Sequence, residues 1–169
     1  MILNRIRKVS LQNKIDKEIK NSRVASNKKV ESILILFDEN IDTQICELIM
    51  IELESDTQKV EKIIFCDTLN NDAQDFQTKI SKKQFSWFGR VRDEKVRGLI
   101  NFNFDLLINL TTSNLYLDYL TVLSNSQFKV GLSNSDIRLY DFMISTNLEE
   151  KTVFSNELND RFVDYFDKS

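Results

Sequence analysis

The sequence contains no proline, no histidine and only three glycines among its 169 residues. Average usage would give roughly eight prolines in a chain of this length. Without histidine, the side chain that most often acts as a base near neutral pH is missing. Gly89, Gly98 and Gly131 are too far apart to form a glycine-rich loop around a phosphate group. These shortages exclude the familiar nucleotide-binding motifs and argue against most kinds of catalysis.

The sequence also has only two cysteines, Cys46 and Cys66. Two cysteines form neither a disulfide framework nor a four-ligand zinc site, and the usual three-ligand sites need histidine. We therefore expect no structural metal and no cofactor. Cys66 is a candidate nucleophile at a strand end, but a small apolar thiol in a buried strand is the commoner role, and no histidine is present to activate it.

Long apolar runs are missing as well. No stretch approaches the ~20 apolar residues that a membrane span requires, and 41% apolar with 29% charged residues is typical of a soluble globular chain. Arg5, Arg7 and Lys8 lie close to the first residue, so the apolar core of a signal peptide is absent. We expect one soluble domain, without a membrane span, in the cytoplasm.

The charge is unevenly distributed along the chain. Residues 1–29 hold nine basic and two acidic side chains, a balance of +7, whereas residues 30–169 hold 14 basic and 24 acidic side chains, a balance of −10. The first segment lacks glycine and proline and is predicted to be mostly helical. It is expected to meet an anionic partner, namely a nucleic acid, an acidic protein or the chain's own acidic face, or else to pack on its own domain with a solvated basic side.

The apolar residues of this segment do not form one stripe. Ile6 and Val9 share one helical face, whereas Leu11 and Ile15 fall on another. The pattern predicts a bend near Ser10 or two partners for two faces.

From residue 31 onward, apolar runs of strand type alternate with helical patterns. The predicted strands are residues 32–37, 62–67, 104–110, 128–132 and 142–145, and the predicted helices follow the first, third and fifth of them. Continuous apolar strands interleaved with helices indicate a mostly parallel sheet that is covered on both faces. The sequence therefore predicts a single α/β Rossmann-like domain of three layers over residues 30–169, with a basic helical N-terminal extension over residues 1–29.

Several runs resemble a known but uncharacterised family. "ILILFDEN", "SKKQFSWFGR", "FDLLINLTT" and "FKVGLSNSDIRLYDFMI" are similar, in the same order, to a domain of unknown function from Bacteroidota. A shorter stretch, "FDLLINLTTSNLYLDYLTVLSNSQFKVGLSN", looks like part of the N-terminal Rossmann-like half of heptosyltransferases of the GT-B type. The second resemblance implies architecture and, as an alternative function, an enzyme or small-molecule binder related to glycosyltransferase half-domains.

The carboxyl ends of the predicted strands are the usual ligand site of such a sheet. The candidates there are Asp38, Asp67, Asn109, Thr111, Thr112, Ser113 and Asn114. Two aspartates at adjacent strand ends are able to bind Mg²⁺ or to act as acid and base. The alternative is that these aspartates form helix caps and turns, which is the commoner role of aspartate at such positions.

A second basic region lies between the second and third predicted strands. Residues 79–97 contain seven basic side chains and only two acidic ones, and aromatic residues Phe85, Trp87 and Phe88 lie among the cations. The cations are able to pair with phosphates while an aromatic ring stacks on an unpaired base, for ~1–3 kcal/mol. The alternative is a short strand whose aromatic side chains cover the sheet, in which case at least one of them is exposed.

Charge placement favours a non-catalytic binding protein that docks onto a large anionic partner. RNA or a ribonucleoprotein, for example the ribosome, is the first partner class and an acidic protein surface is the second. A self-associating structural protein is a third possibility, and an exposed apolar helix face would indicate it. The predicted partner-binding residues are Arg5, Arg7, Lys8, Lys14, Lys17, Lys82, Lys83, Trp87, Arg90 and Arg92.

Overall fold

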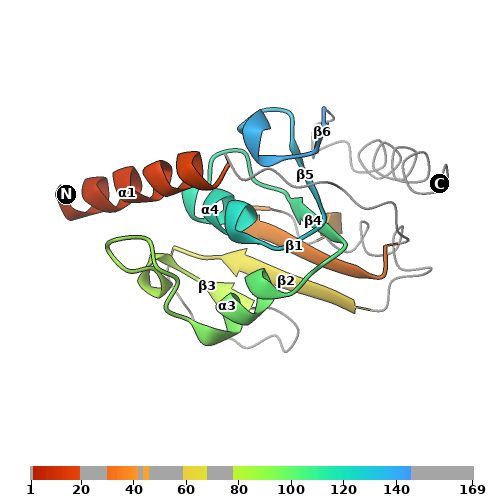
Figure 1. The fold of residues 1–169 in the computed structure, drawn as a ribbon, viewed down its shortest axis with the longest axis horizontal. Coiled ribbons are helices and arrows are strands. Elements are labelled where there is room, and N and C mark those ends of the chain that lie inside the picture. Colours follow the sequence, from red (N-terminus) through yellow and green to blue (C-terminus); the bar gives the residue numbers. More distant parts are fainter. Residues whose placement is uncertain (1, 20–29, 42–43, 46–58, 68–77, 146–169) are drawn as a thin grey trace.

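The computed structural model describes residues 2–19, 30–41, 44–45, 59–67 and 78–145 of the chain. Its centre is a six-stranded sheet in the order β3-β2-β1-β4-β5-β6, in which every neighbouring pair is parallel (Figure 1). The strands are β1 (Ser32–Asp38), β2 (Lys59–Phe65), β3 (Thr78–Ile80), β4 (Leu106–Asn109), β5 (Phe128–Leu132) and β6 (Phe142–Ile144). The strand order changes direction between β1 and β4, as it does in Rossmann folds. The chain is therefore a single α/β domain of Rossmann-like type, as the sequence predicts.

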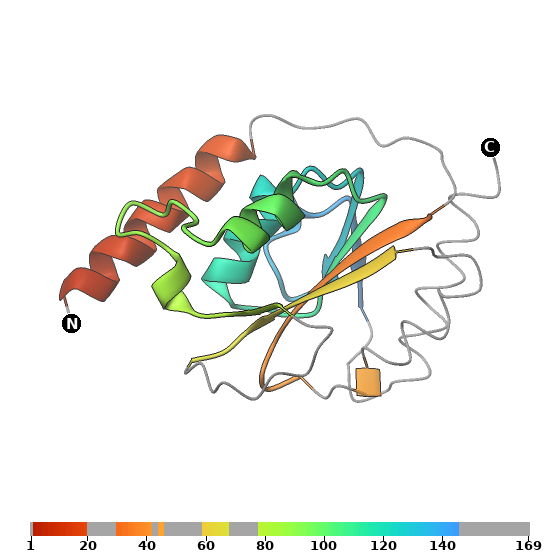
Figure 2. The same ribbon diagram turned by 90° about the horizontal axis from the view of Figure 1, so that it is seen from below.

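Three helices lie on one face of this sheet (Figure 2). They are α1 (Ile2–Glu18), α3 (Glu94–Asn101) and α4 (Leu115–Leu123), and two short 3₁₀ turns, η1 (Lys82–Gln84) and η2 (Ile137–Leu139), accompany them. None of the described helices is long and apolar enough to cross a membrane.

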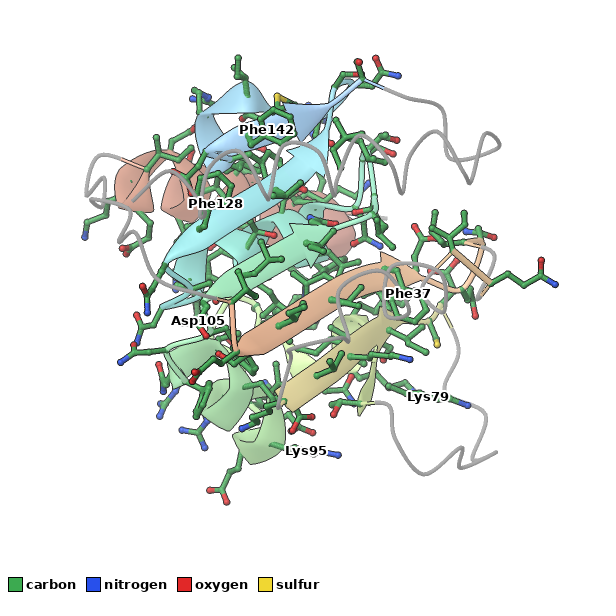
Figure 3. The ribbon with its side chains drawn as sticks, turned by 90° about the vertical axis from the view of Figure 1, so that its right-hand side faces the viewer. Phe37, Lys79, Lys95, Asp105, Phe128 and Phe142 are labelled. Atoms are coloured by element: carbon green, nitrogen blue, oxygen red, sulfur yellow. The ribbon has the colours of Figure 1, made fainter. Side chains whose placement is uncertain are left out.

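The central strand β1 is buried on both faces, as its continuous apolar run predicts. In β1, Leu34 and Leu36 pack with the helices, whereas Ile33, Ile35 and Phe37 belong to a second cluster on the opposite face. Figure 3 looks onto that opposite face with α1 behind the sheet and labels three of its phenylalanines, Phe37, Phe128 and Phe142. This period of two is the geometry of an extended strand, so each run of apolar residues supplies both cores.

The N-terminal helix packs on its own domain. Leu11 and Ile15 are fully buried in the cluster between the helices and the sheet, where α1 lies against α4. Ile6 and Val9, on the other face of α1, are exposed. The helix is continuous from Ile2 to Glu18, without a break at Ser10, and its two apolar faces are one buried side and one side in solvent.

The strand β3 and the helix α3 were not predicted from the sequence, and both are short. The strand β3 has only three residues and pairs with β2 at the edge of the sheet. The helix α3 is capped by Asp93, whose side chain accepts a hydrogen bond from the amide of Val96 at 3.0 Å. It buries Val96, Leu99 and Ile100. Their helical spacing was not recognised in the sequence because the segment was interpreted by its many basic residues. The helices predicted over 41–49 and after Thr146 lie largely or wholly outside the described residues.

Candidate nucleic-acid interface

Residues 82–92, which we call the aromatic hairpin, fold back on themselves between β3 and α3. Phe85 and Val91 form an isolated antiparallel bridge, and both side chains are buried in the core. The amide of Ser86 donates to the carbonyl of Arg90 at 2.8 Å, and Gly89 closes the turn with a φ of +74°. A left-handed φ of this kind favours glycine. The base of the hairpin is therefore anchored in the core.

The aromatic hairpin lies beside α1, as Figures 1 and 2 both show. Arg7 Nη1 donates a hydrogen bond to the backbone carbonyl of Lys82 at 3.1 Å. The guanidinium of the same arginine lies over the ring of Trp87, 4.5 Å from its centroid. Arg7 is only 9% exposed, so this side chain joins α1 to the hairpin. Arg7 was predicted to contact a partner directly, but it is buried and stabilises the contact between α1 and the hairpin.

Gly89 allows this close approach. A Cβ at this position would lie 2.9 Å from Leu11 Cδ2 and 3.3 Å from Lys14 Cδ. Lys14 is half-buried, and its Nζ lies 5.9 Å from the ring centroid of Tyr119. The hairpin is thus able to pack closely against α1 because Gly89 has no side chain. The charge pattern of the sequence does not predict this contact.

The remaining predicted cations are exposed and form what we call the basic surface. Its members are Arg5, Lys8 and Lys17 of α1 and Lys82, Lys83, Arg90 and Arg92 of the aromatic hairpin. Within the described part of the chain, no carboxylate lies within ion-pair distance of any of them. The one acidic residue of α1 that forms a described ion pair, Asp16, lies 3.1 Å from Arg138 instead. Two basic regions that are far apart in the sequence are therefore brought into contact through α1 and the hairpin.

The three aromatic residues of the hairpin have different environments. Phe85 is buried and contacts Tyr116, with ring centroids 4.9 Å apart. Trp87 is 40% exposed and Phe88 is 76% exposed. Two of the three aromatic side chains are therefore exposed. The short strand that was the alternative prediction is absent, because a 3₁₀ turn and a single bridge replace it.

The aspartates at the strand ends form turns and backbone contacts. Asp38 Oδ1 accepts a hydrogen bond from the amide of Asn40 at 3.1 Å, and the carbonyl of Asp38 accepts one from Ile41. The amide of Asp67, in turn, donates to Glu39 Oε1 at 3.0 Å. Among the described residues, no group of three or more histidine, cysteine or acidic side chains is arranged to hold a metal ion.

Asn109, at the end of β4, is fully buried rather than facing a ligand. Its Nδ2 donates to Thr121 Oγ1 at 3.1 Å and to Tyr140 Oη at 2.9 Å, and its Oδ1 accepts from the amide and hydroxyl of Thr111. Tyr140 covers this network from beyond β5. A Cβ on Gly131 would lie 2.6 Å from the ring of Tyr140, so glycine makes room for that ring. The network joins β4, α4 and the segment after η2.

Asp118 of α4 borders the same network. Burial, together with the nearby Asp136 carboxylate, raises the pKa of Asp118 to about 6, although hydrogen bonds from Tyr140 and Asn109 oppose the shift. Burial and the charge of Asp118 also raise the pKa of Tyr140. Arg138, which donates to both oxygens of Asp136, lowers the pKa of that carboxyl. Asp118 is the titratable group that the sequence did not point to, because its environment comes from residues distant in the chain.

The other strand-end candidates divide into structural and exposed residues. Asn114 caps α4 by accepting hydrogen bonds from the amides of Tyr116 and Leu117. Thr112 and Ser113 are exposed. Cys66 is buried, and burial and Glu39 raise the pKa of its thiol despite the opposing effect of Lys79, which disfavours the reactive thiolate.

A pocket of about 140 Å³ is lined by residues at the end of α1, in α4 and β5, and around η2. Glu18 and Ile19 at the end of α1, Lys129 of β5 and Arg138 of η2 are among its lining residues. The amine of Lys129 donates to the carbonyl of Thr121 at 2.6 Å, and Arg138 is paired with aspartates. The two cations that line this pocket are therefore engaged within the chain.

Comparison with known proteins identifies a family but no activity. The chain belongs to a family of unknown function, DUF6913, which it matches over residues 7–160. This match covers α1 from Arg7 onward, the aromatic hairpin and the whole described sheet. No curated protein and no solved structure matches the chain. The local likeness to heptosyltransferases and the link to Bacteroidota stay predictions.

Proposed function

We propose that this DUF6913 member is a non-catalytic binding protein that docks onto RNA or onto a ribonucleoprotein such as the ribosome. The observation that carries the proposal is the direct contact between α1 and the aromatic hairpin, the two elements that bear the exposed cations. Arg7 and Gly89 fix the two elements together, so the exposed cations of both are held in one arrangement. Pre-ordering of this kind lowers the entropy cost of binding.

The local charge favours an anionic partner even though the whole chain carries a formal charge of −3. The cations of the basic surface are exposed and, among the described residues, unpaired. Exposed lysine and arginine side chains attract phosphates and release the counterions condensed on a nucleic acid. Among the acidic side chains that the structure describes, none neutralises this surface by direct pairing.

Aromatic side chains favour RNA over an acidic protein. Trp87 and Phe88 are exposed among the cations of the hairpin. RNA offers phosphates that pair with the cations and base faces that stack on the rings, so it matches both kinds of exposed side chain. An acidic protein surface supplies only the charge and is the second partner class. We propose a bacterial source from the resemblance to a Bacteroidota domain, and a cytoplasmic location from the charged residues near the first residue.

The strand-end region supports a role without catalysis. Asp38 and Asn114 form a turn and a helix cap, and Asn109 and Thr111 bond to each other inside a buried network. Polar groups engaged in this way stabilise the fold, and their lone pairs and protons are already used.

The test is to recover the tagged chain from the cells that produce it, with and without ribonuclease treatment. A variant with Lys82, Lys83, Arg90 and Arg92 changed to glutamine is compared with a control variant, Lys59→Gln/Lys62→Gln, on β2. We expect RNA to accompany the wild type and the control, and to be lost from the hairpin variant. Recovery of a protein partner that resists ribonuclease would favour the acidic protein surface. Equal recovery of RNA by all three chains would contradict the role of the basic surface.

A small-molecule binder related to glycosyltransferase half-domains is the second candidate. The observation in its favour is the change of strand direction between β1 and β4, since ligands of open α/β sheets bind at that point. Thr112 and Ser113 follow β4 and are exposed there. A thermal shift on adding nucleotide sugars, lost in the Thr112→Ala/Ser113→Ala variant, would favour this candidate.

A further inference from the structure

We infer that the tip of the aromatic hairpin is a stacking platform for an unpaired base, so that the basic surface selects single-stranded RNA over duplex RNA. This inference rests on the proposed function and adds the form of RNA that is bound. The carrying observation is the exposure of Phe88, 76%, at the end of an anchored hairpin. An exposed phenylalanine in a well-ordered turn has no role in the core of its own chain.

The hairpin holds this ring in place. Its base is closed by the Phe85–Val91 bridge and by hydrogen bonds from Ser86 to Arg90 and from Arg92 to Gln84, at 2.8 and 2.7 Å. The amide of Gly89 also donates to the carbonyl of Ser86 at 3.0 Å, which defines the turn that presents the two aromatic residues. A ring presented on such a turn meets a base without first ordering a loop.

Trp87 is a second ring with one face already occupied. The guanidinium of Arg7 covers it at 4.5 Å, and the indole remains 40% exposed. Arg7 is therefore a positioning residue that holds the indole against α1 beside Phe88. A base that approaches the exposed part of the indole would add to the contact with Phe88, and both contacts tolerate any base because every base has an aromatic face.

The cations around the tip define where the RNA backbone would run. Lys82 and Lys83 precede the tip and Arg90 and Arg92 follow it, and all four are exposed. A single strand is able to place phosphates on both sides while its bases turn toward the rings. A duplex hides its base faces by stacking and offers only phosphates and groove edges. The same charges therefore attract both forms, and the rings discriminate between them.

The test measures binding of the full chain to a labelled single-stranded RNA of about twelve nucleotides and to the same strand annealed to its complement. We expect the wild type to bind the single strand about ten-fold more tightly than the duplex. Phe88→Leu should lose most of this preference, with duplex binding and the salt dependence unchanged because no charge is removed. Phe88→Tyr should retain the preference, since a phenol ring also stacks.

Phe102→Leu is the matched control, because Phe102 is exposed but lies after α3, where its ring contacts Phe104 and Lys59. It should leave the preference intact. Circular dichroism of each variant checks that the chain is folded. Equal affinity of the wild type for both RNA forms, or an unchanged preference in Phe88→Leu, would overturn the stacking inference while RNA docking stands. Failure of the wild type to bind either RNA would overturn the proposed function as well.

Discussion

Changing Lys82 and Lys83 to glutamine should weaken the salt dependence of RNA binding by a calculable amount. Both side chains are exposed and, among the described residues, free of ion pairs. The contact with α1 should survive the change, because Arg7 donates to the backbone carbonyl of Lys82 and not to its side chain. The variant therefore removes two charges from the hairpin without removing what holds it in place.

The expected size follows from counterion release. Each phosphate contact with a single strand contributes about −0.7 to the slope of log affinity against log salt, so loss of two contacts reduces the slope by about 1.4. Between about 50 and about 200 mM salt, the wild type should then lose about seven-fold more affinity than the variant. Binding is followed by fluorescence anisotropy of a labelled single-stranded RNA at several salt concentrations.

The matched control is Lys59→Gln/Lys62→Gln, which makes the same change in charge on β2. Lys62 lies on the sheet face opposite α1, together with Ile64 and Val60 of the second cluster. This control should bind with the slope of the wild type. A slope that is the same in the wild type and the hairpin variant, or that falls equally in the control, would refute the assignment of these lysines to phosphate contacts.

Three further predictions concern stability. Asp118 has a folded-state pKa of about 6, above its ordinary 3.8, so its stabilising contribution is lost as pH rises through 6. The variant Asp118→Asn should therefore have a free energy of unfolding higher than that of the wild type by on the order of 2 kcal/mol near pH 8, and nearly the same one near pH 4, as measured by urea denaturation. Leu11→Ala should cost about 2–5 kcal/mol in the same assay, because Leu11 is fully buried, and a loss below about 1 kcal/mol would mean that α1 is separable from the core. Asp38→Asn and Asp67→Asn should change stability only modestly and leave RNA capture intact; loss of capture in a stable variant would point to the strand ends instead.

Much of the sheet was predictable because its strands are buried on both faces. The run of β1 stands out as an uninterrupted apolar segment, and a helical pattern between two strands favours a parallel crossover. The strand β3 gave no such signal, since three residues at a sheet edge are too few to show a period. The helix α3 was hidden because its apolar spacing lies within a segment dominated by charge.

Each of the two basic regions was predictable from the sequence, but the contact between them was not. It depends on Arg7 reaching a backbone carbonyl and on a glycine that lets Leu11 approach, and neither contact leaves a pattern in residue types. For Asn109, the sequence prediction itself fails. Its place at a strand end predicts an open site, but Tyr140, 31 residues later, covers and bonds to it. Long-range packing of this kind decides whether a polar residue is available to a ligand.

The most direct test of the account is ultraviolet crosslinking of the full chain to single-stranded RNA, followed by mass spectrometry of the crosslinked peptides. Aromatic side chains in contact with bases are expected to crosslink, and the structure presents Trp87 and Phe88 for that contact. We predict crosslinks in the peptide that contains these two residues, and their loss in the Trp87→Leu/Phe88→Leu variant. Crosslinks confined to the strand-end residues Thr112 and Ser113, or an unchanged pattern in the variant, would contradict the central claim.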